Sequence, residues 1–147
     1  MIIVRCLNII RKIILALVLA LNLSLTQAQT YVQINGVSVH DQSGYNGFNY
    51  GAGLEQVVHG PWSVAGGWYR NSEYQGSAYA YGRYAVYQQG SWNLGIAVGA
   101  VTGYQRSTVL PMAFPEACYA WVCALFIPRV DATGTNTLGL RLRIPVN

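Results

Sequence analysis

Charged side chains are scarce in this sequence. Asp, Glu, Lys and Arg make up 10% of its 147 residues, whereas about 25% is typical of a soluble domain. After residue 28 the chain contains six arginines and five acidic residues, so the formal charge of this part is only +1. A nucleic-acid-binding domain needs at least a basic patch, and we therefore expect no nucleic-acid partner.

Long apolar runs are also missing after residue 28, although hydrophobic residues make up 52% of the sequence. The apolar run 13–25 is short for the roughly 20 residues of a membrane-spanning helix. Three basic residues precede it and "TQAQ" follows it, which is typical of a secretory signal peptide. We predict cleavage after Ala28, leaving one domain over 29–147.

Cysteines are few, and Cys6 belongs to the predicted signal. Cys118 and Cys123 would lie on opposite faces of one strand, so a bridge between them would require an intervening turn. We interpret both as small apolar residues. Without paired histidines their spacing is a weak zinc signal, and we expect no metal and no cofactor.

A two-residue alternation is the strongest pattern in the sequence. In "NTLGLRLRIPV" the leucines occupy one face and Arg141 and Arg143 the other; a period of two over this length predicts a strand. Arginines facing lipid are costly. We therefore expect Arg83, Arg141 and Arg143 to point into an interior, with Glu55 as the expected partner.

Turn residues divide the remainder into strands. The predicted strands are 30–40, 50–58, 62–71, 77–87, 92–102, 108–115, 120–127 and 137–145. An even count, low charge and alternating short and longer connections predict an all-β fold, an eight-stranded antiparallel transmembrane β-barrel of the outer membrane.

A soluble barrel of lipocalin type has the same strand count. We prefer the membrane form because aromatic residues fall at both predicted strand ends, as in the two girdles of membrane barrels. One group comprises Tyr31, Trp62, Tyr87, Trp92 and Tyr119. The other comprises Tyr45, Phe48, Tyr50, Trp68, Tyr69, Tyr74 and Tyr104.

An eight-stranded barrel is too narrow for an open pore but can hold one small ligand. The predicted strand 120–127 is apolar on both faces. Either a lipid-like ligand occupies the interior beside it, or Val122, Ala124 and Phe126 fill that interior themselves.

Two reactive side chains fall at the predicted extracellular end. Both termini of an even-stranded outer-membrane barrel are periplasmic, so the first strand rises to end at His40 and the third at Asn71 and Ser72. An imidazole can activate a hydroxyl as a nucleophile. His59, in contrast, falls in a predicted periplasmic turn, where we interpret it as surface.

Several stretches resemble the outer-membrane lipid A palmitoyltransferase family. "NLGIAVGAVTGY", "VLPMAFPEACYAWVCALFIP" and "NTLGLRLRIPV" resemble its C-terminal half, and "YGAGLE" its glycine-rich second strand. "VSVH" falls where the family has its catalytic histidine, and "YRNS" where it has an Asp-Ser pair. The resemblance implies that His40 is the base and Ser72 its hydroxyl partner, with Asn71 in place of the aspartate.

The chain departs from that family in three respects, one of which is a shorter first loop. An amphipathic N-terminal helix is missing, and Asn71 can orient an imidazole but cannot offset its positive charge, which weakens general-base action. Asp41 or Glu73 could supply a carboxylate nearby. On this basis Asn71→Asp is expected to preserve or raise activity.

The resemblance implies transfer of a fatty acyl chain from a phospholipid to a hydroxyl of lipid A. It places this reaction at the surface of a Gram-negative bacterium, either one that encodes the protein itself or one infected by a phage that encodes it. The implied partners are outer-membrane lipids, and we expect a monomer. Tyr69 is assigned to substrate binding, together with Gly82, which lies one residue out of register with the glycine at the family's pocket floor.

Two other functions stay open, and so does whether the chain is an enzyme at all. One is a non-catalytic surface or adhesion barrel. The other is a lipid A deacylase, a family whose histidine and serine are separated by one residue on one strand, whereas His40 and Ser43 have two residues between them.

Overall fold

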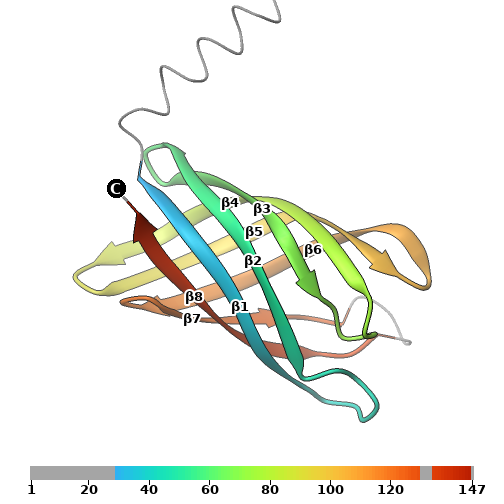
Figure 1. The fold of residues 1–147 in the computed structure, drawn as a ribbon. Coiled ribbons are helices and arrows are strands. Elements are labelled where there is room, and N and C mark those ends of the chain that lie inside the picture. Colours follow the sequence, from blue (N-terminus) through green and yellow to red (C-terminus); the bar gives the residue numbers. More distant parts are fainter. Residues whose placement is uncertain (1–28, 130–133, 147) are drawn as a thin grey trace, which may run out of the picture.

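The computed structural model describes residues 29–129 and 134–146, so the predicted signal peptide lies outside the described residues. Eight antiparallel strands form a closed barrel in chain order (Figure 1), with β8 paired to β1. They are β1 Thr30–His40, β2 Phe48–His59, β3 Trp62–Arg70, β4 Gly76–Gln89, β5 Trp92–Tyr104, β6 Ser107–Tyr119, β7 Val122–Ile127 and β8 Thr137–Val146. The prediction of an eight-stranded all-β barrel is confirmed. No helix within the described ranges is long and apolar enough to cross a membrane.

The two ends of the barrel differ. The start of β1, the end of β8 and the turns 60–61, 90–91 and 120–121 gather at one end, here called the terminal end. The connections 41–47, 71–75 and 105–106, together with 128–129 and 134–136, lie at the other, here called the loop end (Figure 1). The loop end therefore contains His40, Asn71 and Ser72.

Inward and outward residues alternate as the sequence predicts. Leu138 and Leu140 are exposed on the outer face of β8, whereas Arg141 and Arg143 are 4% and 6% exposed. In β5, Ile96 and Val98 face outward and Ala97 is fully buried. The outside of the barrel is consequently apolar, and the arginines lie in its interior.

Exposed aromatic residues gather near both ends of this outer face. Ring contacts join Trp62 to Tyr84 and Trp92 to Tyr119 at the terminal end. Near the loop end, Tyr50 contacts Phe48 and Trp68. Three tyrosines of the predicted groups point inward instead: Tyr31 lies under Arg143, and Tyr69 and Tyr104 line the interior.

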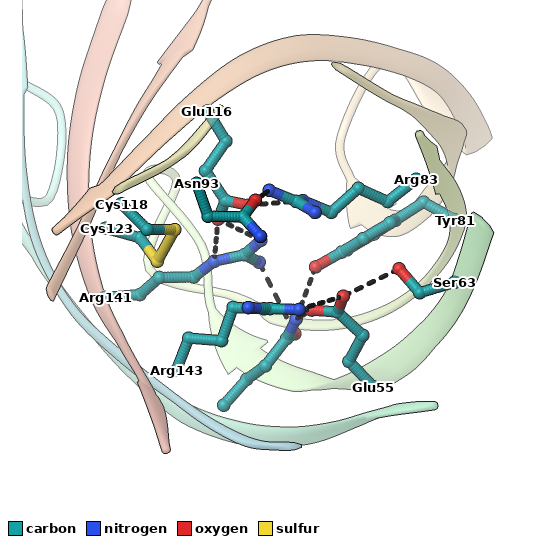
Figure 2. The surroundings of a disulfide bond; sticks show 11 residues. Glu55, Ser63, Tyr81, Arg83, Asn93, Glu116, Cys118, Cys123, Arg141 and Arg143 are labelled. Carbon is teal, nitrogen blue, oxygen red and sulfur yellow. Dashed lines mark hydrogen bonds and ion pairs between the residues drawn. A yellow bond between two sulfur atoms is a disulfide. The ribbon is translucent and has the colours of Figure 1, made fainter. Parts of the chain in front are cut away.

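A charge network fills the interior toward the terminal end (Figure 2). Glu55 accepts two hydrogen bonds of 2.9 Å from Arg143. Glu116 accepts from Nε of Arg83 at 2.7 Å and from Nε of Arg141 at 2.6 Å. All five side chains are buried, so the barrel is closed on this side by ion pairs.

The network confirms the inward arginines and corrects their partners. Glu55 pairs with Arg143, but Glu116 holds Arg83 and Arg141. Glu116 was expected in a connection; it lies in β6, which continues to Tyr119. Glycine makes this packing possible, because a Cβ on Gly95 would lie 2.5 Å from the Arg83 guanidinium.

The interpretation of the two cysteines was wrong. Cys118 and Cys123 form a disulfide (Figure 2). The turn at 120–121 makes them directly opposite partners on β6 and β7, and Ala120 adopts a positive φ of 51° there. The predicted connection lay at 116–119, a few residues before the turn at 120–121. With the connection placed there, the two cysteines were not expected to face each other on neighbouring strands.

The same shift affects the face of β7. Val122 and Phe126 are 52% and 43% exposed and lie outside, so the expectation that they fill the interior was wrong. Leu125 and Ile127 line the interior instead.

Candidate functional site

The half of the interior toward the loop end is an open cavity of about 400 Å³. Its walls are apolar and aromatic, and this set includes Tyr79, Tyr81, Val101, Leu110, Met112, Phe114, Leu125 and Ile127. Its mouth is lined by polar loop-end residues, among them Ser38, His40, Asn49, Ser72, Glu73, Arg106 and Arg129. The arrangement suits a ligand with an apolar body and a polar head.

His40 ends β1 at this mouth, held on both ring nitrogens. Nδ1 lies 2.9 Å from the Thr137 hydroxyl on β8. Nε2 lies 3.0 Å from Ser38 Oγ and 3.1 Å from the carbonyl oxygen of Asn46. Because a carbonyl can only accept, it favours a proton on Nε2 at rest, and it also stabilises the imidazolium that forms when a base takes up a proton. In the other neutral tautomer Nδ1–H donates to the Thr137 hydroxyl and Nε2 is free to act as the base.

Ser38 is the residue that sequence reasoning missed. It precedes His40 by two positions, so both side chains lie on the same face of β1. Its hydroxyl donates to Asn49 Oδ1 and lies within hydrogen-bond distance of the imidazole. The signal was visible as "SVH", a serine and a histidine separated by one residue.

Ser72 lies at the same mouth but is not among the hydrogen-bond partners of His40 in the described chain. Its carbonyl oxygen accepts the N–H of Asn46 at 2.8 Å. Asn46 thus joins the two predicted residues, because its own carbonyl faces His40. The structure brings both residues to one side of the mouth, and a catalytic role for Ser72 stays a prediction.

Asn71 is fully buried and its side chain is engaged in the 71–75 turn. Oδ1 accepts the N–H groups of Glu73 and Gln75, both at 2.9 Å. Nδ2 donates to Ser77 Oγ at 3.0 Å and to the carbonyl of Gly103 at 2.8 Å. These four bonds close the turn and attach it to β5, and none is made to His40.

The two predicted substrate-binding residues lie in different places. Tyr69 lines the cavity, where its hydroxyl lies 3.0 Å from that of Tyr104. Gly82 lies on the outer face beside Trp62 and Tyr84, and a Cβ added there would meet nothing within 4 Å. Because Tyr81 and Arg83 on either side of it point inward, Gly82 does not line the cavity.

The two carboxylates suggested near the mouth already have partners. Asp41 accepts from Thr135 Oγ1 at 2.5 Å, and from the backbone N–H and side-chain amide of Asn136. The Thr135 hydroxyl, followed by Asn136, holds the pKa of Asp41 below its usual value. Glu73 accepts the N–H of Gln105 at 2.9 Å. In the described part of the chain neither carboxylate is a hydrogen-bond partner of His40, and Asp41 instead attaches the 41–47 loop to the residues that precede β8.

The barrel wall is weakly paired beside the cavity. In the described residues β6 pairs with β7 only from Glu116↔Leu125 to Tyr119↔Val122. The part of β6 nearer the loop end contains Pro111 and Pro115, which have no N–H to donate. This seam is a place where the cavity could communicate with the outer face.

Comparison with models of known protein families gives no match, and comparison with curated protein sequences gives none either.

Proposed function

We propose that this protein is an outer-membrane acyltransferase that moves a fatty acyl chain from a phospholipid to lipid A at the cell surface. The observation that carries the proposal is the apolar cavity of about 400 Å³ with His40 at its mouth. Each methylene buried in such a cavity contributes about 0.8 kcal/mol, so a long acyl chain is the ligand that this interior would favour.

The outer surface supports a membrane location. Its exposed side chains are aliphatic along the middle of the barrel and aromatic toward both ends, the distribution of a membrane barrel. With the termini on the periplasmic side, the loop end faces the cell surface. The seam between β6 and β7 then offers the acyl chain a lateral path from the membrane.

His40 would act as the general base of a direct transfer. Its imidazole takes the proton of the lipid A hydroxyl, and that oxygen attacks the carbonyl carbon of the phospholipid ester. The bond from the acyl carbon to the glycerol oxygen then breaks, and the imidazolium returns the proton to this oxygen. Arg106 and Arg129 at the mouth suit lipid phosphates, because guanidinium groups bind phosphate well.

The Ser38–His40 contact favours a second candidate, hydrolysis of the acyl ester. In that reaction the ring carries its proton on Nδ1, facing Thr137, and Nε2 takes the Ser38 proton while Ser38 Oγ attacks the ester carbonyl carbon. The bond from the acyl carbon to the alcohol oxygen breaks and the imidazolium protonates that oxygen. Water activated by the same imidazole then cleaves the acyl-serine ester, which releases a fatty acid and restores the Ser38 hydroxyl. Thr137 would orient the ring in both reactions. The two reactions differ in product: a more heavily acylated lipid A or a free fatty acid.

The test is turnover in vesicles that contain acyl-labelled phospholipid and lipid A, with mass spectrometry of both lipids. His40→Ala should abolish the product, and Thr137→Val should lower its rate by about tenfold. The matched control is His59→Ala, at the terminal end. If Ser38→Ala abolishes the product and Ser72→Ala does not, Ser38 supplies the hydroxyl that works with His40. The opposite result would assign that hydroxyl to Ser72. If the folded wild-type protein forms neither product, the proposal fails and a non-catalytic barrel is the function that remains.

A further inference from the structure

The floor of the cavity carries an uncompensated positive charge. The charged side chains buried in the described part of the barrel are three arginines and two glutamates, which leaves a net charge of +1. Burying a charge without a partner is costly. An anion at the floor would remove this imbalance.

Arg141 is the guanidinium that faces the cavity. It is 4% exposed and is one of the lining residues. Of its five N–H groups, Nε donates to Glu116 and Nη1 donates to Gln33 over 3.4 Å. Nη2 lies against the same Glu116 oxygen but makes no hydrogen bond of normal geometry. Donors of Arg141 therefore remain for an acceptor that enters from the cavity.

Asn35 supplies a second donor at the same place. It is the direct cross-strand partner of Arg141 in the β1–β8 ladder and also lines the cavity. Its Nδ2 is buried and makes no hydrogen bond of full geometry within the described chain; the nearest acceptor for it is the Tyr79 hydroxyl. Two neighbouring donors, one of them cationic, match the two oxygens of a carboxylate.

The path to this floor runs along β8. The inward positions above Arg141 are Gly139 and Thr137; Gly139 has no side chain of its own, and the Leu125 side chain lies against it. Tyr81 and Phe114 pack against the Arg141 guanidinium, so a ligand that reaches Arg141 must pass between these side chains. Thr137 lies about 13 Å away along the strand, at about 3.3 Å per residue. The side chains beside this path are apolar, including Val101, Leu110 and Ile127.

We propose that the cavity binds a free long-chain fatty acid with its carboxylate at Arg141 and Asn35 and its hydrocarbon chain extended toward the mouth. This orientation is opposite to that of an acyl ester reacting at His40, whose methyl end would lie at the floor. The site is independent of the chemistry at the mouth, and a fatty acid bound in it would compete with an acyl donor.

The experiment uses palmitate labelled with carbon-13 at its carboxyl group, added to the protein in phosphatidylcholine nanodiscs. Empty nanodiscs give the background. We expect a distinct carboxyl signal in the carbon-13 NMR spectrum that a water-soluble paramagnetic chelate does not broaden. Unlabelled palmitate should displace the labelled ligand at concentrations at least tenfold lower than hexadecanol, which has the same chain length without the charge.

Two variants of one residue complete the test. Asn35→Ala removes one of the two donors and should weaken palmitate binding about tenfold. Asn35→Asp also places a carboxylate beside Arg141 and should weaken binding further, by at least about another tenfold. His59→Ala, at the terminal end and outside the cavity lining, should bind palmitate as the wild type does. The proposal is overturned if the chelate broadens the bound signal, since the carboxylate would then lie at the mouth. It is equally overturned if hexadecanol competes as well as palmitate. These two measurements on the wild type decide the matter even if Asn35→Asp does not fold.

Discussion

Replacing Glu116 with glutamine tests whether ion pairs hold the terminal half of the barrel together. Glu116 is 3% exposed, and its two partners Arg83 and Arg141 are 1% and 4% exposed. The substitution keeps the shape and one acceptor oxygen but raises the buried net charge from +1 to +2. It leaves two guanidinium groups without a carboxylate.

The expected loss follows from these contacts. Removing one partner of a buried ion pair costs about 3–5 kcal/mol, and the retained amide oxygen recovers about 1 kcal/mol through a neutral hydrogen bond. We expect the free energy of unfolding to fall by about 3 kcal/mol. Adding Arg83→Met returns the net charge to +1 and should recover at least about 1 kcal/mol of that loss.

The assay is urea unfolding in detergent micelles, followed by tryptophan fluorescence and analysed by linear extrapolation. Urea is preferred because guanidinium chloride would screen the charges. Glu73→Gln is the matched control: its carboxylate accepts one backbone N–H near the surface, so its effect should stay within about 0.5 kcal/mol. A Glu116→Gln protein within 1 kcal/mol of the wild type would refute the argument.

Three further predictions concern the disulfide and the loop end. Replacing Cys118 and Cys123 together with alanine should lower the free energy of unfolding by about 2 kcal/mol, the entropic value for a loop this short, and an unchanged urea midpoint would contradict this. The pKa of Asp41 is lowered by the hydrogen bond from the Thr135 hydroxyl and, after it, by Asn136. The ionised Asp41 therefore stabilises the loop fully above the unfolded pKa of about 3.9. This stabilisation is lost as the pH falls through the lower pKa of the folded state. Protection of the Asn136 amide from hydrogen exchange should therefore fall under acid conditions in the wild type but not in Asp41→Asn. Asn71→Asp should destabilise the barrel by about 1–3 kcal/mol, because both donations from Nδ2 are lost inside a buried turn; equal stability and higher turnover would show that the turn is not its main role.

The strands were predictable where one face is polar or small and the other aliphatic. In β8 the alternation placed Arg141 and Arg143 inside correctly, because a register shift by one residue would place both arginines on the outer face. The stretch "PEACYAWVCALFI" lacks that contrast. With apolar residues on both faces, the register around 116–127 could not be determined, and the errors on Glu116, the disulfide and the face of β7 share this one cause.

The candidate site was predictable in its location but not in its contacts. Strand counting placed His40 and Ser72 at one end of the barrel. It could not show that the imidazole contacts Ser38 and Thr137, because Thr137 is nearly a hundred positions away and meets His40 only when β8 closes onto β1. Barrel closure is a long-range event, and no local pattern encodes which loop-end residues become neighbours.

Asn71 shows why residue type at an aligned position is a weak guide to chemistry. An asparagine side chain at this position can orient a histidine, or it can form hydrogen bonds with the backbone of its own turn, since it offers both an acceptor and donors. In this fold the turn uses all of that capacity, and Asp41 and Glu73 are engaged with Asn136 and Gln105. The groups left to stabilise an imidazolium at His40 are neutral: the Asn46 carbonyl and two hydroxyls. In the proposed reaction, general-base catalysis at this mouth would therefore depend on uncharged acceptors, of which the Asn46 carbonyl is the one that can only accept.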